Sequence, residues 1–254
     1  MIATQAVTRY VTPLREGGSL PGLVEADDLG LYVCKFRGAG QGLRVLAAEV
    51  IVAGIASQIG VETPRLVALE LDAEIARFEA DEEVQDLLKA SVGLNLGVDF
   101  LPGAFNVDSA TPVDPAEAGK VLWLDAFVAN VDRSWRNPNL LLWHRRLVAI
   151  DHGACLYFHH GWRDHVGDPQ RFASQPWQAE EHIFVQHLEH LRAADAVARP
   201  LLSREALMGV LDDVPDDWLP GVASARTPNQ VRAAYLDFLT ARLASRTWMP
   251  QEAA

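Results

Sequence analysis

Hydrophobic and polar positions in the first third of the chain follow the short alternation of strands, interrupted by one helical repeat. Residues 6–36 contain two extended runs separated by a Gly-Gly turn, and an Asp-Asp-Leu-Gly turn then leads into the apolar run LYVCKF. In 44–60 the apolar residues recur at helical spacing, and Gly60 stands at the expected C-terminal end of a helix. Pro64 precedes another short strand, RLVALEL. This region is therefore expected to be β-rich and crossed by one helix.

The pattern changes to helical spacing in the rest of the chain. Residues 73–90 are acidic and expected to be helical, and the apolar run that follows them ends at Pro102-Gly103, which predicts a connection between two lobes. A strong helix is expected from Pro115, because proline is favoured at the first helical position. Two apolar runs around His144-Arg145 indicate a tight hairpin, LLLW (140–143) and RLVAI (146–150). Two or three helices are expected to complete the chain, roughly at 178–198, 203–212 and 228–246.

These elements predict an α+β chain with a β-rich first lobe, residues 1–102, and a helical second lobe, residues 103–254. Residues 159–177 are aromatic, rich in histidine and irregular, so they are expected to form a mobile loop. The chain of 254 residues is long enough to bury a substantial core. Its 49% hydrophobic and 22% charged content is ordinary for a globular protein and argues against a largely disordered chain.

Charge and targeting signals narrow the possible classes of function. A net charge of -12 argues against direct nucleic-acid binding through a broad cationic surface, but it leaves room for a local cationic pocket that binds one nucleotide. No apolar run is long enough for a transmembrane helix, and no signal peptide is expected. Cys34 and Cys155 are the only cysteines and lie in apolar segments, which predicts buried free thiols and a cytoplasmic location.

Three oxygen-bearing side chains have the spacing of a metal-nucleotide site. Asp132 is followed by Asn137, then by the two apolar strands of the expected hairpin, and then by Asp151. Because a hairpin returns the chain to its start, Asp151 is expected beside Asn137. Carboxylate and amide oxygens suit Mg²⁺, which completes its shell with water and phosphate oxygens. Taken alone, each residue is more typical of a surface loop, but their joint order favours a magnesium-nucleotide site.

Lys35 is an unusual lysine, because it lies in an apolar strand of a chain whose other lysines are only Lys89 and Lys120. Strand alternation places it on the face of Leu31 and Val33, which would look into a cleft. A buried ammonium needs a carboxylate or a phosphate beside it. Glu49, in the apolar helical stretch LAAEVIVAG, is the expected partner. The pair is consistent both with a structural salt bridge and with a cation held toward nucleotide phosphates.

One strand upstream of Lys35, the turn REGGSLPG contains Gly17, Gly18 and Ser19. Glycines in this position would let backbone amides approach phosphates. The turn lacks the spacing of a Walker loop or of a dinucleotide fingerprint. An ordinary hairpin turn explains it equally well, so only its place before Lys35 favours phosphate binding.

With these positions together, the chain resembles the HipA-like kinases and, more distantly, the phosphatidylinositol and protein kinases. The resemblance spans roughly residues 8–155. Asp132, Arg133 and Asn137 are similar to the opening of the family's catalytic loop, although Ser134 stands where these loops usually carry histidine. Asp151, in AIDHG, resembles the metal-binding aspartate that these kinases place after a strand.

The resemblance implies a two-lobed protein-kinase-like fold and an ATP- and Mg²⁺-dependent phosphotransferase. By this likeness, Asp132 orients or deprotonates the acceptor hydroxyl, and Asn137 and Asp151 bind magnesium. Lys35, held by Glu49, steadies the α- and β-phosphates, while the glycine turn covers them. The expected acceptor is a protein serine or threonine, with a small molecule as the alternative, and the chain is expected to be the compact kinase core alone.

Two other functions remain open from the sequence. One is a regulatory, pseudokinase-like module that binds a nucleotide without transferring phosphate. The other is a metal-dependent hydrolase built from the dense group of possible ligands in 144–165, although no HExxH motif is present. These residues are His144, Asp151, His152, His159, His160, Asp164 and His165.

Overall fold

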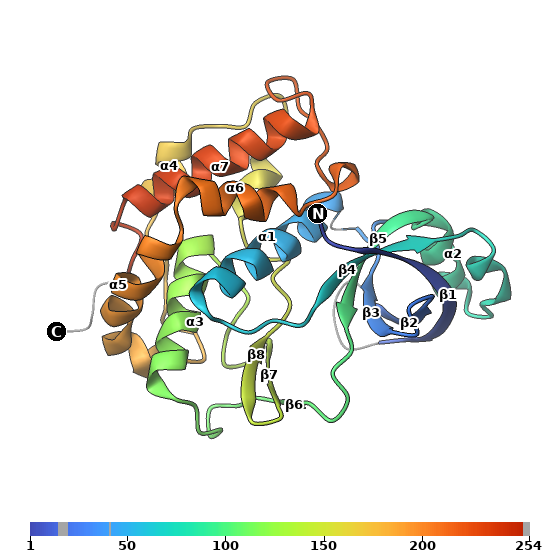
Figure 1. The fold of residues 1–254 in the computed structure, drawn as a ribbon, viewed down its shortest axis with the longest axis horizontal. Coiled ribbons are helices and arrows are strands. Elements are labelled where there is room, and N and C mark those ends of the chain that lie inside the picture. Colours follow the sequence, from blue (N-terminus) through green and yellow to red (C-terminus); the bar gives the residue numbers. More distant parts are fainter. Residues whose placement is uncertain (15–19, 41, 251–254) are drawn as a thin grey trace.

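The computed structural model describes residues 1–14, 20–40 and 42–250. The first part of the chain forms a closed barrel at one end of the molecule (Figure 1). Its strands, in barrel order, are β1 (Thr4–Pro13), β2 (Gly22–Ala26), β3 (Leu31–Lys35), β5 (Gly93–Asp99) and β4 (Leu66–Leu71). All neighbours are antiparallel except β1 and β4, which pair in parallel and close the barrel.

The barrel encloses a small hydrophobic core of its own. Burial alternates along β3, where Tyr32 and Cys34 point into this core and Val33 and Lys35 lie on the opposite face. The predicted alternation of this strand is therefore confirmed. The 3₁₀ helix η1 (Ile75–Phe78) and α2 (Glu82–Ala90) pack against this core through Ala76, Val84 and Leu88.

The range 73–90 is helical as expected, and it is divided into two short helices. The helical conformation stops at Glu79, which has extended backbone angles, and α2 starts afresh after Asp81. The Asp81 carboxylate accepts a hydrogen bond from the backbone N–H of Glu83 at 3.1 Å. A side chain that caps an N-terminus in this way marks a helix start, so the acidic run contains a boundary that its composition conceals.

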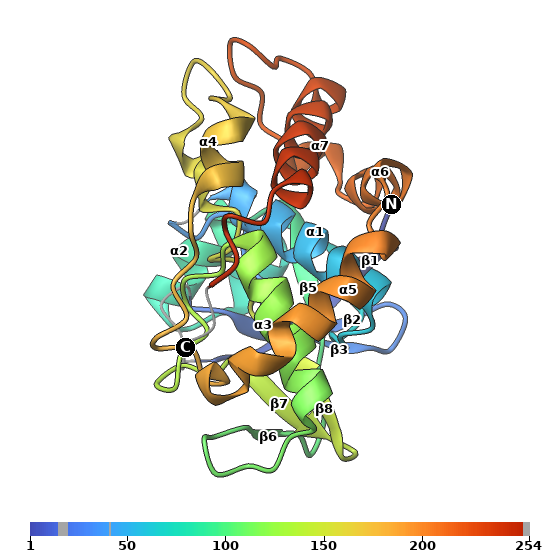
Figure 2. The same ribbon diagram turned by 90° about the vertical axis from the view of Figure 1, so that its left-hand side faces the viewer.

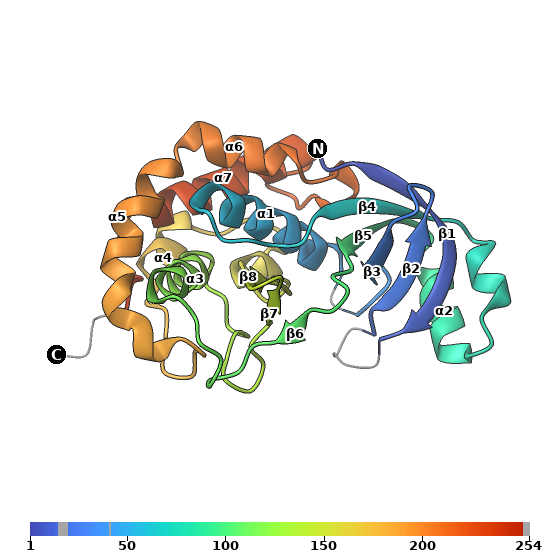
Figure 3. The ribbon, with the colours of Figure 1, turned by 60° about the horizontal axis from the view of Figure 1, so that its bottom comes forward.

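The helix predicted over 44–60 is α1 (Leu43–Ile59), and Gly60 ends it in the left-handed conformation with φ 73°. Although α1 lies between barrel strands in the sequence, it packs among helices of the second half of the chain, as Figures 1 and 3 show. Twelve of its 17 residues are buried, around the whole circumference of the helix. The division into 1–102 and 103–254 stays a prediction, and α1 belongs to the larger core by its packing.

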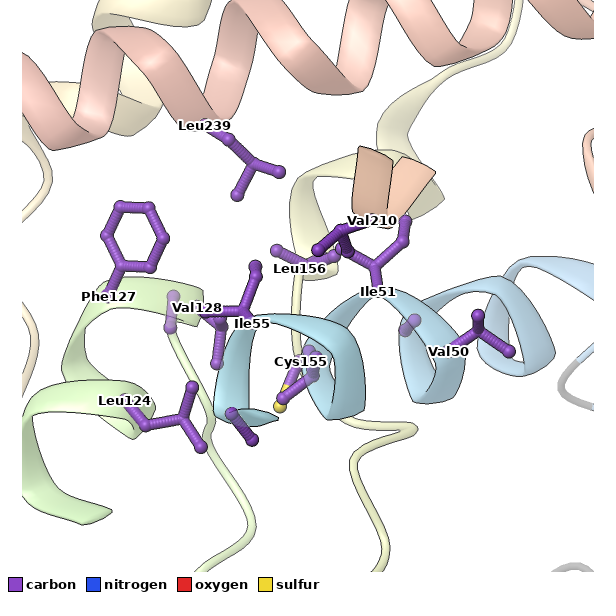
Figure 4. Packing of buried hydrophobic residues seen from close by; sticks show 14 of the residues in the cluster. Val50, Ile51, Ile55, Leu124, Phe127, Val128, Cys155, Leu156, Val210 and Leu239 are labelled. Carbon is purple, nitrogen blue, oxygen red and sulfur yellow. The ribbon is translucent and has the colours of Figure 1, made fainter. Parts of the chain in front are cut away.

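Figure 4 shows this larger core around α1. Ile51 and Ile55 of α1 lie among side chains from α3 (Pro115–Val128), from the segment after the hairpin, and from α6 (Arg204–Asp212). The residues drawn on those partner elements include Leu124, Val128, Cys155, Leu156 and Val210. Burial of this apolar surface is the main force that holds α1 against the helices.

Helix α3 begins where the sequence predicts, since Pro115 is its first residue and the Asp114 carboxylate accepts from the N–H groups of Ala116 and Glu117. The other helices flank it and α1 (Figure 2). They are η2 (Tyr157–Gly161), α4 (Pro169–Ser174), η3 (Val185–His190), α5 (Leu191–Leu201), η4 (Asp216–Trp218) and α7 (Pro228–Ala244), besides α6.

Two expectations for this half are corrected. The segment 159–177 is not one irregular loop, because Asp168 caps α4 and Pro169 opens it. The helix expected over 178–198 begins only at Leu191. The residues before it include His187, whose backbone is not helical, and Phe184, whose N–H is bonded to the His182 side chain at 3.0 Å.

The predicted hairpin is present as β7 (Leu140–Trp143) and β8 (Arg146–Ala149), with β6 (Phe105–Asn106) beside β7. Its register pairs Leu140 with Ala149. Both turn residues, His144 and Arg145, have positive φ, as the tight two-residue hairpin turn requires. Within the described residues, no helix has the length and apolar character needed to span a membrane.

Candidate active site

Lys35 lies where the barrel meets the larger core, and it contacts two carboxylates at once. Its ammonium donates a hydrogen bond to Oε1 of Glu49 on α1 and another to Oδ1 of Asp151 at 2.6 Å. The predicted pairing of Lys35 with Glu49 is therefore present. The two carboxylates raise the pKa of Lys35 even though burial works in the opposite direction, so the group is a fixed cation.

Glu49 is a buried carboxylate with 2% of its surface exposed. While Oε1 accepts from Lys35, Oε2 accepts the backbone N–H of His152 at 2.9 Å. Burial raises the pKa of Glu49, and the Lys35 charge and the His152 N–H oppose that rise. Glu49 thus joins the barrel strand to the segment that carries Asp151.

Asp151 lies two residues after the end of β8 and adopts the left-handed conformation with φ 58°. Aspartate tolerates this conformation better than most residues. Its side chain is 53% exposed, so one end of it is open to a ligand. Burial tends to raise the pKa of Asp151, but the Lys35 ammonium outweighs it and holds the pKa below the usual value. The group is an exposed, ionised oxygen donor beside a fixed cation.

Asp132 is held by amides of its own loop. Its Oδ2 accepts from Nδ2 of Asn137 at 2.9 Å and from Nδ2 of Asn139 at 3.1 Å. The carbonyl oxygen of Asn139 in turn accepts the N–H of Ile150 at 3.0 Å. The hairpin therefore brings Ile150, the residue before Asp151, beside Asn139, which is two residues beyond Asn137. The placement of Asp151 beside Asn137 itself stays a prediction.

Behind this loop lies a buried carboxylate that the sequence analysis did not single out. Asp125, in the last turn of α3, is fully buried and accepts from three side chains. These are Asn130 Nδ2 at 2.8 Å, Arg133 Nε at 2.6 Å and His182 Nε2 at 3.0 Å. Because the Nδ1 of His182 accepts the N–H of Phe184, its Nε2 carries the proton that faces Asp125. Burial opposes ionisation of Asp125, but Arg133 and the other donors lower its pKa to about 2.

Arg133 extends this network to the segment that carries Asp151. Its guanidinium donates to the carbonyl oxygens of Pro138, Asn139 and Ile150 and meets Nδ1 of His152 at 3.3 Å. Burial, followed by the Arg133 charge, lowers the pKa of His152 to about 3, so His152 is neutral and accepts at Nδ1. The buried Asp125–Arg133 ion pair thus fixes the residues that flank Asp132 and those that flank Asp151.

A signal for Asp125 was present in the sequence, because it is a carboxylate inside the apolar helical stretch LWLDAFV. The same reasoning that selected Lys35 applies to it. His182 has no comparable signal, since its partner lies 57 residues away.

Two cavities are lined by residues of this site. A cavity of about 380 Å³ is lined by Val33, Lys35, Asp151 and the chain around 98–104 that leaves the barrel. Another, of about 650 Å³, is lined by residues 129–134, which include Asp132, and by the segment around 175–182. The first contains a cation and an ionised oxygen donor, and the second has Asp132 in its wall.

The histidines do not gather into a metal site. Among the described residues, no group of three or more His, Cys, Asp or Glu side chains is placed to hold a metal ion. His159 is buried and bonded to Tyr235 and His160, while His144 occupies the hairpin turn. The hydrolase alternative therefore has no support from the geometry. Gly17, Gly18 and Ser19 lie outside the described residues.

Comparisons with known proteins give one family match and several similar solved structures. A model of the HipA-like kinase family matches residues 7–248. The crystal structure of the Helicobacter pylori proinflammatory kinase CtkA is similar, with a TM-score of 0.59 and 9% identity over 95% of each chain. A Golgi casein kinase with Mn/ADP bound has a TM-score of 0.48 and 11% identity over 95% of this chain and 73% of that chain. No curated protein matches. The kinase-like α+β fold predicted from the sequence is confirmed.

Proposed function

This chain belongs to the HipA-like kinase family and is a kinase, and we propose that it transfers the γ-phosphoryl group of ATP to a protein serine or threonine in a Mg²⁺-dependent reaction. One observation carries the proposal. Lys35 is bonded to Glu49 and to Asp151 at the wall of a cavity large enough for part of a nucleotide. That is the charge arrangement with which kinases position phosphates and metal. A cytoplasmic location belongs to the same proposal.

Lys35 is the group we assign to the α- and β-phosphates of ATP. Its side chain is 15% exposed, and Glu49 holds the ammonium so that the open side faces the cavity. A cation fixed by a buried carboxylate has no reorganisation to undergo when phosphates arrive. The adenine would lie toward the apolar end of the same cavity, which Val33, Phe100 and Leu141 help to line.

Asn137 and Asp151 are the residues that would hold magnesium. Asp151 offers an ionised and half-exposed carboxylate. The Asn137 side chain donates an amide N–H to Asp132, which leaves the amide oxygen of Asn137 for the metal. Such oxygen donors fit Mg²⁺, whose remaining ligands are water and phosphate oxygens. When bound, the metal would neutralise charge on the phosphates. The hydrogen bond from Asn137 to Asp132 would therefore link the metal ligand to the acceptor site.

Asp132 is the residue we assign to the acceptor hydroxyl. Two amides hold its Oδ2, which leaves Oδ1 to accept the proton of a serine or threonine hydroxyl and to aim that oxygen at the γ-phosphate. The phosphoryl group moves from the β–γ bridging oxygen to the acceptor oxygen, and ADP leaves. Positioning and electrostatics, rather than covalent chemistry on the enzyme, provide the rate enhancement.

The direct test is phosphate transfer from γ-labelled ATP, first with the protein alone and then with cell extract. The wild type is expected to label protein, and Asp132→Asn to lose transfer by at least about a hundredfold while still binding Mg-ATP. Asp237→Asn, which changes an exposed aspartate on α7, serves as the matched control. If Asp132→Asn retains full transfer, the role of Asp132 is wrong. If the wild type binds Mg-ATP but labels nothing, the regulatory, pseudokinase-like alternative is favoured.

Lys35→Ala tests the nucleotide side independently. Loss of the ammonium should weaken Mg-ATP binding and use strongly at little cost in folding, because Glu49 keeps the His152 N–H and can take up a proton. Calorimetric titration of Mg-ATP and a thermal melt measure the two effects. Unchanged ATP kinetics would mean that Lys35 forms only a structural salt bridge with Glu49.

A further inference from the structure

The larger cavity beside Asp132 is a built feature of the fold. Its volume is about 650 Å³, and its walls are the catalytic-loop residues 129–134 and the segment around 175–182. Three hydrogen bonds fasten the segment around 175–182 to the catalytic loop and to α3. Trp177 Nε1 donates to the Asn130 carbonyl at 2.7 Å, the Trp135 N–H donates to the Glu181 carbonyl at 3.1 Å, and His182 donates to Asp125. The cavity is therefore held open next to the residue that we assign to the acceptor.

The accessible charge in this cavity is negative. Asp132, Glu180 and Glu181 all line it, and both glutamates are exposed. Two arginines also border it, but neither offers a free positive charge to a ligand. Arg133 is buried in its ion pair with Asp125, and Arg242 is 1% exposed with its guanidinium bonded to backbone carbonyls, including those at the end of α3.

The rim of the cavity is apolar and unusually exposed. Val131 is 71% exposed and lines the cavity, while Trp135, next to the catalytic loop, is 56% exposed. The Arg136 guanidinium lies 4.2 Å from the Trp135 ring, and Arg136 also pairs with Glu181 at 3.5 Å. The Arg136 guanidinium thus offsets part of the Glu181 charge, and the cavity wall stays negative through Glu180 and Asp132. Exposed apolar residues around a cavity are typical of a surface that a macromolecule covers.

We propose that the acceptor is a protein segment whose serine or threonine is flanked by arginine or lysine side chains, which meet Glu180 and Glu181 while the hydroxyl meets Asp132. This inference rests on the proposed phosphotransfer to protein. The apolar rim favours a polypeptide over a small solute, since a small molecule inside the cavity would leave Trp135 uncovered. The acidic wall makes the same cavity unfavourable for an acidic segment.

The test uses peptides of equal length that carry one serine and differ only in its flanking residues, which are arginine, glutamine or glutamate. The wild type should prefer the arginine peptide to the glutamine peptide by roughly tenfold in kcat/KM, mainly through KM, because exposed ion pairs contribute modestly. The glutamate peptide should be the poorest substrate. The preference should weaken at high salt.

Charge reversal makes the test independent of folding losses. The double variant Glu180→Arg/Glu181→Arg is expected to reverse the order and favour the glutamate peptide, an outcome that an unfolded or inactive protein cannot give. Glu82→Gln/Glu83→Gln, two consecutive exposed glutamates on α2, is the control and should keep the wild-type order.

The outcomes distinguish failure of this inference from failure of the proposed phosphotransfer to protein. If the wild type labels proteins in extract but prefers neutral or acidic peptides, or if the reversed variant keeps the arginine preference, the inference is overturned and the kinase function stands. Better transfer to a small cationic alcohol such as ethanolamine than to any peptide would also overturn it. If the wild type transfers phosphate to no peptide and to no protein, the proposed function itself fails.

Discussion

Replacing Asp125 by asparagine removes one charge from a buried ion pair without changing the size of the side chain. The partner Arg133 is as deeply buried as Asp125, so the substitution leaves a cation in the core without a counterion. Breaking a buried pair from one side typically costs about 3–5 kcal/mol. The pKa of Asp125, lowered from 3.8 to about 2, corresponds to about 2 kcal/mol of preference for the ionised form. We therefore expect a loss of stability between about 2 and 5 kcal/mol.

Urea unfolding at neutral pH measures this loss, with the free energy of unfolding as the readout. Asp237→Asn removes an aspartate whose ion pair with Arg204 is exposed on both sides, so it should cost less than about 1 kcal/mol. In a double-mutant cycle, Arg133→Gln should cost less in the Asp125→Asn background than in the wild type. If Asp125→Asn unfolds within about 0.5 kcal/mol of the wild type, the network contributes no stability and the reasoning is refuted.

The same carboxylate gives an expectation for acid. Since folding lowers the pKa of Asp125, its contribution is fully present above pH 3.8 and is lost as the pH falls toward 2. The stability difference between wild type and Asp125→Asn should therefore shrink between about pH 4 and pH 2. A difference that is constant over this range would show that Asp125 is not ionised in the folded protein.

Two further predictions concern the core. Gly54 of α1 has no room for a side chain, because a Cβ there would lie 2.7 Å from Val210, so Gly54→Val should destabilise the protein by about 1–3 kcal/mol. At Gly209 in α6 nothing lies within 4 Å of such a Cβ, so Gly209→Ala should stabilise the protein by up to about 1 kcal/mol. Equal effects of the two substitutions in urea unfolding would contradict this packing. Cys34 and Cys155 are fully buried, and burial raises the pKa of both thiols. A thiol reagent at pH 8 should therefore label them only after the protein unfolds. Rapid labelling of the native protein would show that one of the thiols is accessible.

The parts that the sequence predicted well are those with local signals. The hairpin is one, since two short apolar runs around a two-residue turn define both its strands and its register. The pairing of Lys35 with Glu49 is another, because each is a charged residue in an apolar element and a buried charge needs a partner. The metal and catalytic roles of Asn137, Asp151 and Asp132 stay predictions.

The parts that the sequence did not predict depend on contacts between distant segments. Asp125 stands out locally as a charge in an apolar helix, but nothing near it indicates that His182, in an irregular segment, donates to it. The late start of α5 has the same origin, because Phe184 is bonded to the His182 side chain and the residues before Leu191 form the 3₁₀ helix η3, whose backbone is not helical at His187. Local propensity gives way to tertiary contacts at these positions.

The site itself is divided between two hydrophobic cores, and this explains why its geometry requires the whole fold. Lys35 belongs to the barrel, whereas Glu49 is fixed by the larger core that surrounds α1. The ion pair between them forms only if the barrel sits correctly on that core. One contact that seats it is the hydrogen bond from the buried indole of Trp218 to the Leu94 carbonyl at 3.0 Å, which joins η4 to β5. These partners are 124 residues apart, so no local sequence pattern predicts their contact. The position of the Lys35 charge nevertheless depends on this contact.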